Sequence, residues 1–356
     1  AVQRHVVISV AQGLAQALSG WEALTWDDIR VGAARSRARF DPSAAARLCL
    51  LMERGTDLNQ LVISARDALA RPEGGRLPDG VYIGAGRPGA LAMLFPGQGS
   101  QYVGMGRDLV CQFPKAFDTL AAADQAFENG RLSDRIFPHP AFTKDERKRQ
   151  ETALRDTRSA QPALGAVSYG AYRVLADFGL LPEAVAGHSY GELVALCGAG
   201  SYDEKTLHHL SALRGKVMAE VAGDGGRMLA VTAASDELDR VIREEGLELV
   251  VANKNTPTQS VLSGCKEEIR RAAEALAKRD LRCVKLPVSA AFHSPLVEGA
   301  QKAFRTALKK LGLRKGDIPV YANKTATVYP EPSQSACDTL AGQLAAPVEF
   351  VSLVEN

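Results

Sequence analysis

The sequence predicts an α/β fold in which a parallel sheet carries the main domain and a smaller subdomain is inserted into it. Two observations predict this: short apolar runs alternate with helical patterns after residue 90, and residues 228–287 have a strand and helix order of their own. Of the 356 residues, 46% are hydrophobic and 32 are glycine. The chain can therefore bury a sizeable core, and it is too apolar to be disordered.

Residues 1 to about 75 are predicted to be helical. Apolar residues recur there at helical spacing, as at Leu48, Leu51 and Met52, and residues 6–18 fit an amphipathic helix. A stretch rich in glycine and proline then breaks the pattern before residue 90. We interpret residues 1–90 as a helical linker region that precedes the main domain.

Three apolar runs are expected to be buried strands of the main domain. Residues 91–95 lead into a glycine turn at 96–100, and residues 184–187 follow a helix predicted over 162–178. The pattern returns at residues 320–323. Strands that alternate with helices favour a parallel sheet.

Residues 228–287 show the order strand, helix, strand, strand, helix, strand, which is that of a ferredoxin-like unit. The six segments are residues 228–233, 236–245, 249–253, 260–263, 266–278 and 282–287. We predict a small inserted subdomain, so that the main subdomain comprises residues 91–227 and 288–356.

Charge and composition exclude several classes of function. The 43 basic and 41 acidic side chains leave a net charge of +2, without the basic field of a nucleic-acid-binding protein. No apolar run approaches the ~20 residues that a membrane-spanning helix needs. The six cysteines are scattered, with no C-x-x-C pair. We expect a cytoplasmic protein that binds neither nucleic acid, membrane nor metal.

The segment Gly187-His188-Ser189-Tyr190-Gly191 is the only G-x-S-x-G sequence in the chain. It lies between a predicted strand and a predicted helix, which is the context of a nucleophile elbow. The strained turn would expose the Ser189 hydroxyl, and the helix start would bring the Tyr190 backbone N–H and a positive dipole to an oxyanion. A helix-capping serine between two glycines is the alternative.

A serine nucleophile needs a base, and His293 is the best placed of the six histidines. It lies in Ala290-Ala291-Phe292-His293-Ser294, where the chain leaves the small subdomain. His188 neighbours the serine and is expected to point away from it. A capping or core histidine is the alternative for His293.

Arg214 lies on the apolar face of a helix predicted over residues 203–221, together with Leu207, Leu210 and Val217. A guanidinium in such a place needs a counter-charge, because its desolvation is otherwise costly. Its partner is either a substrate carboxylate, held by two hydrogen bonds, or a structural ion pair.

The basic stretch at residues 144–149 is interrupted by Asp145 and Glu146. Such mixing favours a solvated helix face, and a docking surface for an acidic partner is the alternative.

Five ordered motifs together resemble those of the malonyl-CoA:acyl carrier protein transacylase family. They are FPGQGSQ at 95–101, SAQPAL at 159–164, GHSYGE at 187–192, RGKVM at 214–218 and AFHS at 291–294. The chain resembles the acyltransferase domain of a type I polyketide or polyunsaturated fatty acid synthase, and the Tyr190 variant of the elbow resembles that of iterative synthases, among them the enediyne polyketide synthases. The resemblance extends over about residues 91–350.

The family resemblance implies an α/β-hydrolase-like main subdomain with a ferredoxin-like small one. Residues 1–90 would be the linker region that follows a ketosynthase in the parent synthase.

The resemblance also implies the reacting groups. Ser189 matches the acylated nucleophile, and His293 matches its base. A backbone carbonyl, which would belong to Gln343, orients the imidazole in place of an acidic residue. The backbone N–H groups of Gln98 and Tyr190 match the oxyanion hole.

Further residues match the acyl pocket of the family. Gln161 and Arg214 would line it, and Asn253 and Asn255 would lie near its entrance. The aromatic residue at Phe292 resembles the version found in malonyl-selecting domains, where the ring narrows the space beside the α-carbon.

The implied reaction moves a malonyl group from malonyl-CoA, through an acyl-serine, to the phosphopantetheine thiol of an acyl carrier protein, with ping-pong kinetics and no cofactor. A serine hydrolase or thioesterase is the main alternative. It would need an acidic third member such as Asp236 or Asp280, and it gives no reason for Arg214. A catalytically silent binding domain is a second alternative, which fits an intact serine and histidine pair poorly.

Overall fold

The computed structural model describes residues 4–9, 25–41, 43–70, 76–87, 89–222, 226–288, 290–331 and 333–356. The chain divides into two compact units, Ala1–Ala90 and Leu91–Asn356.

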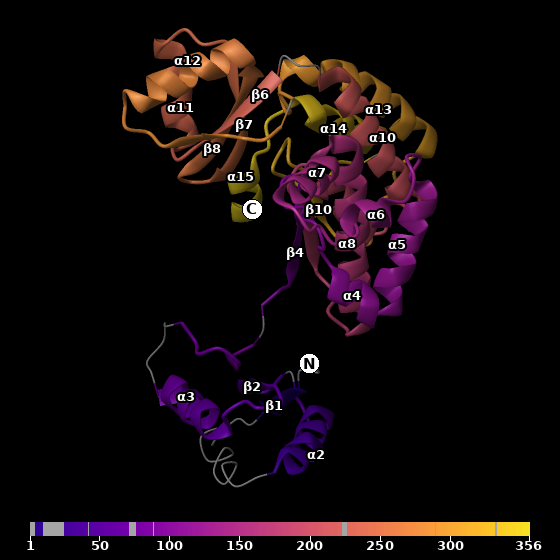
Figure 1. The fold of residues 1–356 in the computed structure, drawn as a ribbon, viewed down its shortest axis with the longest axis vertical. Helices are drawn as coiled ribbons and strands as arrows, with labels where there is room; N and C mark the ends of the chain where they lie inside the picture. The colour runs from indigo at the N-terminus through magenta and orange to yellow at the C-terminus, as the bar shows by residue number, and fades with distance from the viewer. Residues whose placement is uncertain are drawn as a thin grey trace. The chain divides into compact units, whose positions relative to one another are not determined.

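The first unit is built on a three-stranded antiparallel sheet. Strands β1 (Arg4–Ser9), β2 (Ala46–Met52) and β3 (Val81–Ala85) pair in the order β1-β2-β3. Two helices, α2 (Trp26–Ala38) and α3 (Leu58–Ala70), belong to the same unit (Figure 1). Their apolar side chains and those of β2 and β3 form one hydrophobic core.

The prediction of a helical region over residues 1 to about 75 is therefore wrong for β1 and β2. In β2, Leu48, Leu50 and Met52 are buried while the residues between them are half-buried, which is the period of two of a strand. A short, nearly continuous apolar run fits the helical period and the strand period equally well, so the sequence pattern does not distinguish helix from strand here. Of the helix predicted over residues 6–18, residues 6–9 lie in β1 and the rest lies outside the described residues.

A parallel sheet runs through the second unit. Its described strands, β4 (Ala92–Phe95), β5 (Ala184–Gly187) and β10 (Val320–Tyr321), pair in the order β10-β5-β4. These strands occupy the three predicted apolar runs. The prediction that residues 91–95 are buried is wrong for most of β4: Leu94 is 52% exposed and only Phe95 is buried, because β4 is an edge strand of the described sheet. The prediction of an α/β fold with a parallel sheet is confirmed.

Helices pack around this sheet, and α5, α8 and α10 lie side by side (Figure 1). The described helices of this part are α4 (Arg107–Gln112), α5 (Pro114–Ala126), α6 (Leu132–Ile136), α7 (Lys144–Arg155), α8 (Thr157–Asp177), α9 (Gly191–Gly198), α10 (Glu204–Ala222), α13 (Glu298–Leu311), α14 (Ser333–Gly342) and α15 (Phe350–Glu355), with 3₁₀ turns η2 (Pro295–Val297) and η3 (Gln343–Ala345). The short helix α9 is buried over nearly its whole length, which fixes its first turn firmly in the core.

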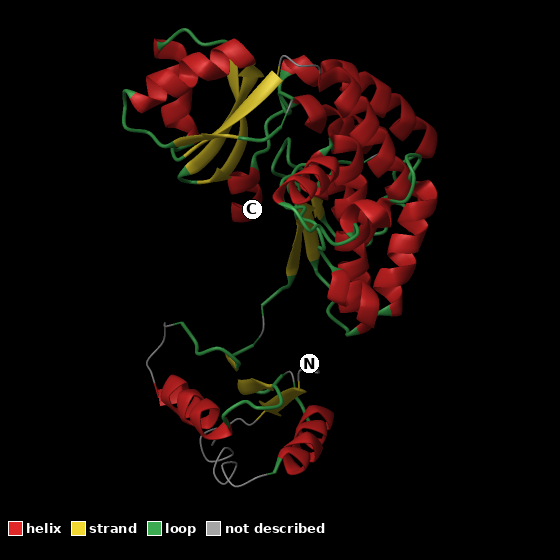
Figure 2. Cartoon of the chain, in the orientation of Figure 1, coloured by secondary structure: helices red, strands yellow, loops and turns green. Residues whose placement is uncertain are grey.

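A second, antiparallel sheet is formed by the chain between α10 and α13. Strands β6 (Gly226–Val231), β7 (Leu249–Thr256), β8 (Gln259–Cys265) and β9 (Cys283–Lys285) pair in the order β7-β8-β6-β9. Helices α11 (Ser235–Glu244) and α12 (Lys266–Ala277) pack against it and share its core (Figure 2).

The two sheets of the second unit are linked near the end of the chain. Val348 forms a parallel bridge with Asn253 of β7, through hydrogen bonds of 2.8 Å to the Ala252 carbonyl and 3.0 Å from the Lys254 N–H. The next N–H, that of Glu349, donates to the Asn323 carbonyl just after β10, at 2.9 Å. The segment before α15 therefore fixes the small sheet to the carboxyl ends of the parallel strands.

Across the described ranges, no helix combines the length and apolar character needed to cross a bilayer. Within the same ranges, no three His, Cys, Asp or Glu side chains are grouped as metal ligands.

Candidate active site

Ser189 lies in the tight turn between β5 and α9. Its φ of +50° is in the left-handed region, which costs a non-glycine residue roughly 1–3 kcal/mol and requires support from its surroundings. Asn323 supplies that support: its Oδ1 accepts from the Ser189 N–H at 2.6 Å, and its Nδ2 donates to the Gly187 carbonyl at 2.5 Å. One side chain thus holds both ends of the turn.

The two glycines of the turn are required by close backbone packing. A Cβ at Gly187 would lie 2.0 Å from the carbonyl carbon of Gly191, and one at Gly191 would lie 2.1 Å from the Phe95 carbonyl oxygen. No side chain fits at those distances. The G-x-S-x-G spacing is therefore a packing requirement of the elbow.

The half-buried hydroxyl of Ser189 is hydrogen-bonded to His293, with 2.7 Å between Oγ and Nε2. His293 Nδ1 lies 3.0 Å from the Gln343 carbonyl oxygen and 3.1 Å from that of Ala346. Because carbonyl oxygens only accept, the proton resides on Nδ1, and Nε2 is left to accept from the serine. The backbone of His293 is also in the left-handed region, with φ +57°.

The imidazole is neutral at pH 7. Burial and the nearby positive charge of Arg214 lower the pKa of His293 to about 3. No carboxylate within the described part of the chain hydrogen-bonds to the ring. Asp236 and Asp280, the candidates for an acidic third member, are exposed in the small-sheet region.

The backbone N–H groups of Gln98 and Tyr190 make no hydrogen bond within the described residues. The loop that contains Gln98 is held against the elbow, since the His188 N–H donates to the Phe95 carbonyl at 2.9 Å. The Gln98 side chain is fixed as well, because its Nε2 donates to Thr157 Oγ1 at 3.1 Å. Both N–H groups thus remain available to a negatively charged oxygen.

Arg214 is 1% exposed. Its Nη2 donates to Gln343 Oε1 at 3.1 Å, its guanidinium carbon lies 5.9 Å from the centre of the Tyr190 ring, and its Nε has no partner. Burial lowers the pKa of Arg214 to about 10, so it stays protonated at pH 7. The structural ion pair that the sequence leaves open is not formed with any described residue.

Glu192 is fully buried one helical turn after the serine. Its carboxyl accepts from the Asn323 N–H at 3.0 Å, from Gln343 Nε2 at 3.4 Å and from the Tyr329 hydroxyl. Burial raises the pKa of Glu192 to about 7. This group therefore changes its charge in the physiological pH range.

Gln343 connects the reacting pair to this buried cluster. Its backbone carbonyl faces His293, while its side-chain amide accepts from Arg214 and donates to the Ser189 carbonyl at 2.7 Å. Gln343 therefore contacts both Arg214 and the imidazole that faces Ser189.

Gln161 and Phe292 are both buried. Gln161 Nε2 donates to Gln98 Oε1 at 3.3 Å, and its own Oε1 has no partner. Phe292 is 8% exposed, and its carbonyl accepts from Ser263 Oγ of β8 at 2.8 Å.

The two asparagines that the sequence places near the entrance differ in their surroundings. Asn255 Oδ1 lies 2.7 Å from His188 Nε2, and the His188 ring packs edge-on against Phe350 at 5.2 Å. Asn253 is only 5% exposed and belongs to the bridge with Val348.

Three residues of the site carry no prediction from the sequence: Asn323, Glu192 and Tyr329. A signal existed for Asn323, because it follows a predicted strand of the parallel sheet, and carboxyl ends of neighbouring parallel strands meet at one edge. Glu192 and Tyr329 are 137 positions apart in the chain, and only the fold shows that they meet.

A serine on a strand-to-helix turn, hydrogen-bonded to a neutral histidine beside two free N–H groups, is the arrangement of enzymes that transfer acyl groups through a serine. The family model for the acyl transferase domain matches residues 92–355, and the chain belongs to this family.

Relatives of known activity extend this assignment. The malonyl CoA-acyl carrier protein transacylase of Bacillus subtilis is 35% identical over 267 residues, which cover 73% of this chain and 80% of that protein. A polyunsaturated fatty acid synthase polypeptide of Thraustochytrium sp. is 30% identical over 337 residues, which cover 88% of this chain and 12% of that polypeptide. The chain thus spans a small part of the synthase polypeptide.

Solved structures agree with the sequence relatives. The acyltransferase domain of an iterative polyketide synthase in enediyne biosynthesis matches with a TM-score of 0.73 and 27% identity, over 99% of this chain and 82% of that chain. A malonyl-transacylase in complex with its type II polyketide acyl-carrier protein matches with a TM-score of 0.69 and 32% identity, over 75% of this chain and 84% of that chain. The family resemblance predicted from the five motifs is confirmed.

Proposed function

We propose that this chain transfers a malonyl group from malonyl-CoA to the phosphopantetheine thiol of an acyl carrier protein, by way of an acyl-enzyme on Ser189. The observation that carries the proposal is the 2.7 Å contact between Ser189 Oγ and His293 Nε2, next to a buried arginine without an ionic partner. The names of the Bacillus transacylase and of the carrier-bound transacylase support the same substrate and acceptor.

In the first half-reaction, His293 Nε2 takes the hydroxyl proton while Ser189 Oγ attacks the thioester carbonyl carbon. The carbonyl oxygen becomes an oxyanion, which the N–H groups of Gln98 and Tyr190 stabilise. The carbon–sulfur bond then breaks, and the CoA sulfur leaves with the proton from His293.

In the second half-reaction, the carrier thiol gives its proton to His293, and its sulfur attacks the acyl-serine carbonyl. The bond to Ser189 Oγ breaks, and this oxygen recovers the proton. CoA leaves before the carrier reacts, so the kinetics are ping-pong. All proton transfers use one imidazole, and no cofactor is required.

Selection of a dicarboxylic acyl group is assigned to Arg214. Its unpaired Nε and its guanidinium fork match the two oxygens of a carboxylate. Among the described residues Arg214 forms no direct ion pair, and Glu192 acts on it only through space, so a malonyl carboxylate would supply the direct ionic partner.

We also infer a finer domain assignment. Residues 91–227 and 288–356 form an α/β-hydrolase-like subdomain, and residues 228–287 a ferredoxin-like one, for which the β7-β8-β6-β9 order is the supporting observation. Residues 1–90 follow a ketosynthase in the parent synthase, although they contain a sheet as well as helices.

The experiment that separates a transferase from a hydrolase follows a radiolabelled malonyl group after the enzyme has been loaded. Release mainly to a carrier thiol supports the proposal, and release mainly to water despite saturating carrier contradicts it. Asp236 and Asp280 are exposed, and His293 Nδ1 faces carbonyl oxygens and not a carboxylate, which favours the transferase.

A further inference from the structure

A cavity of about 370 Å³ lies beside the loop that carries Gln98. It is enclosed by residues 101–103, by residues 138–141, by Arg107 of α4 and by one side of α7. The α7 residues that line it are Arg147, Gln150, Glu151, Leu154 and Arg155. Their spacing of three, four, seven and eight positions places them on a single helix face.

The cavity has more positive than negative charge. Three guanidinium groups, those of Arg107, Arg147 and Arg155, line it together with one carboxylate, that of Glu151. Arg155 is paired with Glu151 at 3.4 Å, and Arg107 lies over the Phe137 ring at 5.8 Å. Neither Arg107 nor Arg147 has an acidic partner in the described part of the chain. An anion entering the cavity would therefore meet two uncompensated cations.

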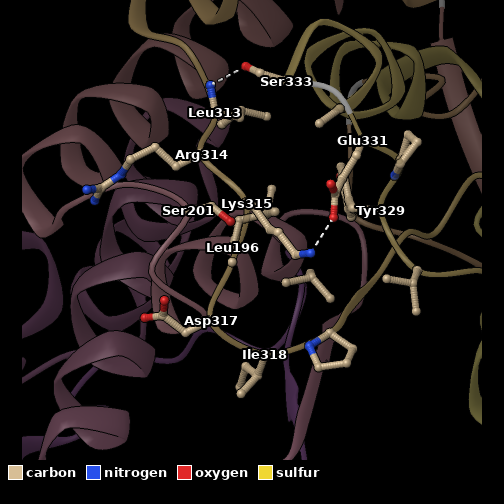
Figure 3. A pocket seen from close by; sticks show the side chains of 16 residues that line it. Leu196, Ser201, Leu313, Arg314, Lys315, Asp317, Ile318, Tyr329, Glu331 and Ser333 are labelled. Atoms are coloured by element: carbon tan, nitrogen blue, oxygen red, sulfur yellow. Dashed lines mark hydrogen bonds and ion pairs between the residues drawn. The ribbon is translucent and has the colours of Figure 1, made fainter.

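In a larger cavity elsewhere in the second unit, the cationic side chains already have partners (Figure 3). It measures about 410 Å³ and is lined by Leu196, Tyr329 and residues 313–320, among others. Its cations are already engaged: Lys315 pairs with Glu331 at 2.6 Å, and Arg314 donates to the Gly200 carbonyl at 3.4 Å. The arginines of the α7 cavity are thus distinguished by having no such partners.

The α7 cavity adjoins the proposed oxyanion site. Gln101 lines the cavity, and its Oε1 accepts from the Gly99 N–H at 2.7 Å, one residue after Gln98. On the other side, Gln98 Nε2 donates to Thr157, two residues after Arg155. Because three residues of extended chain span at most about 11 Å, the cavity lining at Gln101 begins within that distance of Gln98.

We propose that the α7 cavity binds the phosphate groups of CoA while its acyl group occupies the Ser189 site. The inference rests on the proposed function, since the donor is then a thioester that ends in phosphates. Guanidinium groups hold phosphate oxygens through paired N–H donors. Tyr102, which is 65% exposed and lines the cavity, offers an aromatic face on which a base can stack.

The phosphopantetheine arm of an acyl carrier protein also ends in a phosphate ester, so the carrier is a second source of a phosphate group for this cavity. CoA carries more phosphate charge than that arm, and a cavity with two unpaired arginines suits the more highly charged ligand. The α7 cavity is accordingly assigned to the donor half-reaction.

The test compares two donors on the intact chain, malonyl-CoA and malonyl-N-acetylcysteamine, which has no phosphate. Acylation of Ser189 is measured by rapid quench for the wild type, Arg147→Gln and the matched control Arg149→Gln, which removes an exposed arginine of α7 outside the cavity. We expect Arg147→Gln to raise KM for malonyl-CoA about tenfold with kcat unchanged, because a charge-assisted contact is lost. Malonyl-N-acetylcysteamine and the control variant should show no change.

Adenosine 3′,5′-bisphosphate serves as a direct probe. It should compete with malonyl-CoA in the wild type and compete about tenfold less well in Arg147→Gln. Equal losses with both donors, or an unchanged KM for malonyl-CoA, would overturn the assignment. Slower transfer from the loaded variant to carrier, with normal loading from CoA, would also overturn it and assign the phosphate to the carrier arm.

Failure of the proposed function looks different. In that case neither donor acylates Ser189 in the wild type, and there is no acylation rate with which to compare the variants.

Discussion

Ser189 and His293 are positioned mainly by backbone packing and backbone carbonyls, with the Asn323 side chain supporting the serine turn. Arg214 and Glu192 are held mainly by side chains, above all the Gln343 amide. The serine lies on a turn that close glycine packing defines, and the imidazole is oriented by two carbonyl oxygens. The buried charges instead depend on the Gln343 amide and neighbouring side chains. We infer from this difference that the reacting pair would treat all acyl groups alike, whereas the buried cluster would respond to the charge of the acyl group.

We therefore expect the rate of acyl transfer and the selectivity between acyl groups to depend on different residues. Changes at the pair should slow every acyl group alike, and changes at the cluster should alter the ratio between acyl groups. Gln343 contacts both His293 and Arg214, so a substitution there should change the rate and the selectivity together.

The largest effect is expected for His293→Ala. Loss of a general base typically costs roughly 10²- to 10⁴-fold in rate, and the loss should be equal for malonyl and acetyl donors. Single-turnover acylation of Ser189 measures it, with circular dichroism as the check on folding. An unchanged single-turnover rate would show that another group is the general base.

The next effect is expected for Arg214→Ala. Truncating one member of a buried charge pair costs ~2–5 kcal/mol, and malonyl transfer should lose about that much while acetyl loading improves relative to it. The ratio of kcat/KM for malonyl-CoA and acetyl-CoA is the measurement. Equal losses for both donors would show that Arg214 has a structural role, and would contradict the assignment of selectivity to the buried cluster.

A smaller change in selectivity is expected at Phe292. The buried ring leaves little room for an added methyl group, since overpacking costs ~1–3 kcal/mol. Malonyl should be preferred over methylmalonyl by roughly 10- to 200-fold, and Phe292→Ser should reduce that ratio. Competition of the two CoA esters for one carrier tests it: equal loading by the wild type removes Phe292 from the account.

The smallest effect concerns pH. Since the pKa of His293 is lowered to about 3, protonation of the base should not reduce kcat/KM between pH 5 and 7. The pKa of Glu192 is raised to about 7, so this carboxyl gains a negative charge beside Arg214 as the pH rises past neutrality. Malonyl loading should then fall a few-fold and acetyl loading should not, because only malonyl is repelled.

Glu192→Gln is the matched control for that pH profile. It keeps the shape of the side chain without its titration, and the decline in malonyl loading above pH 7 should disappear. A decline that persists in this variant would assign the titration to another group.

The elbow could be predicted because its requirements are local. Gly187, Ser189 and Gly191 are close in sequence, and the short strand before them has a recognisable apolar pattern. The placement of Arg214 in the core follows from helical spacing in the same way. His293 could be chosen among the six histidines from its position where the chain leaves the small subdomain, and the family resemblance supported that choice, although 104 positions separate it from the serine.

The rest depended on tertiary contacts that leave no pattern in the sequence. Asn323 and Tyr329 reach the elbow only because β10 pairs with β5, and polar residues near a strand end are common. In the first unit, the run around Leu48 and Leu50 fitted two periods, and its pairing with β1 and β3 decided between them.

The central claim is that the acyl group passes through Ser189. Its most direct test is the intact mass of the chain, quenched within the first turnover after mixing with malonyl-CoA. The account predicts an increase of one malonyl group in the wild type, located on the peptide that contains Ser189, and no increase in Ser189→Ala. A malonyl adduct that persists in Ser189→Ala, or carrier loading by the wild type without any adduct, would contradict it.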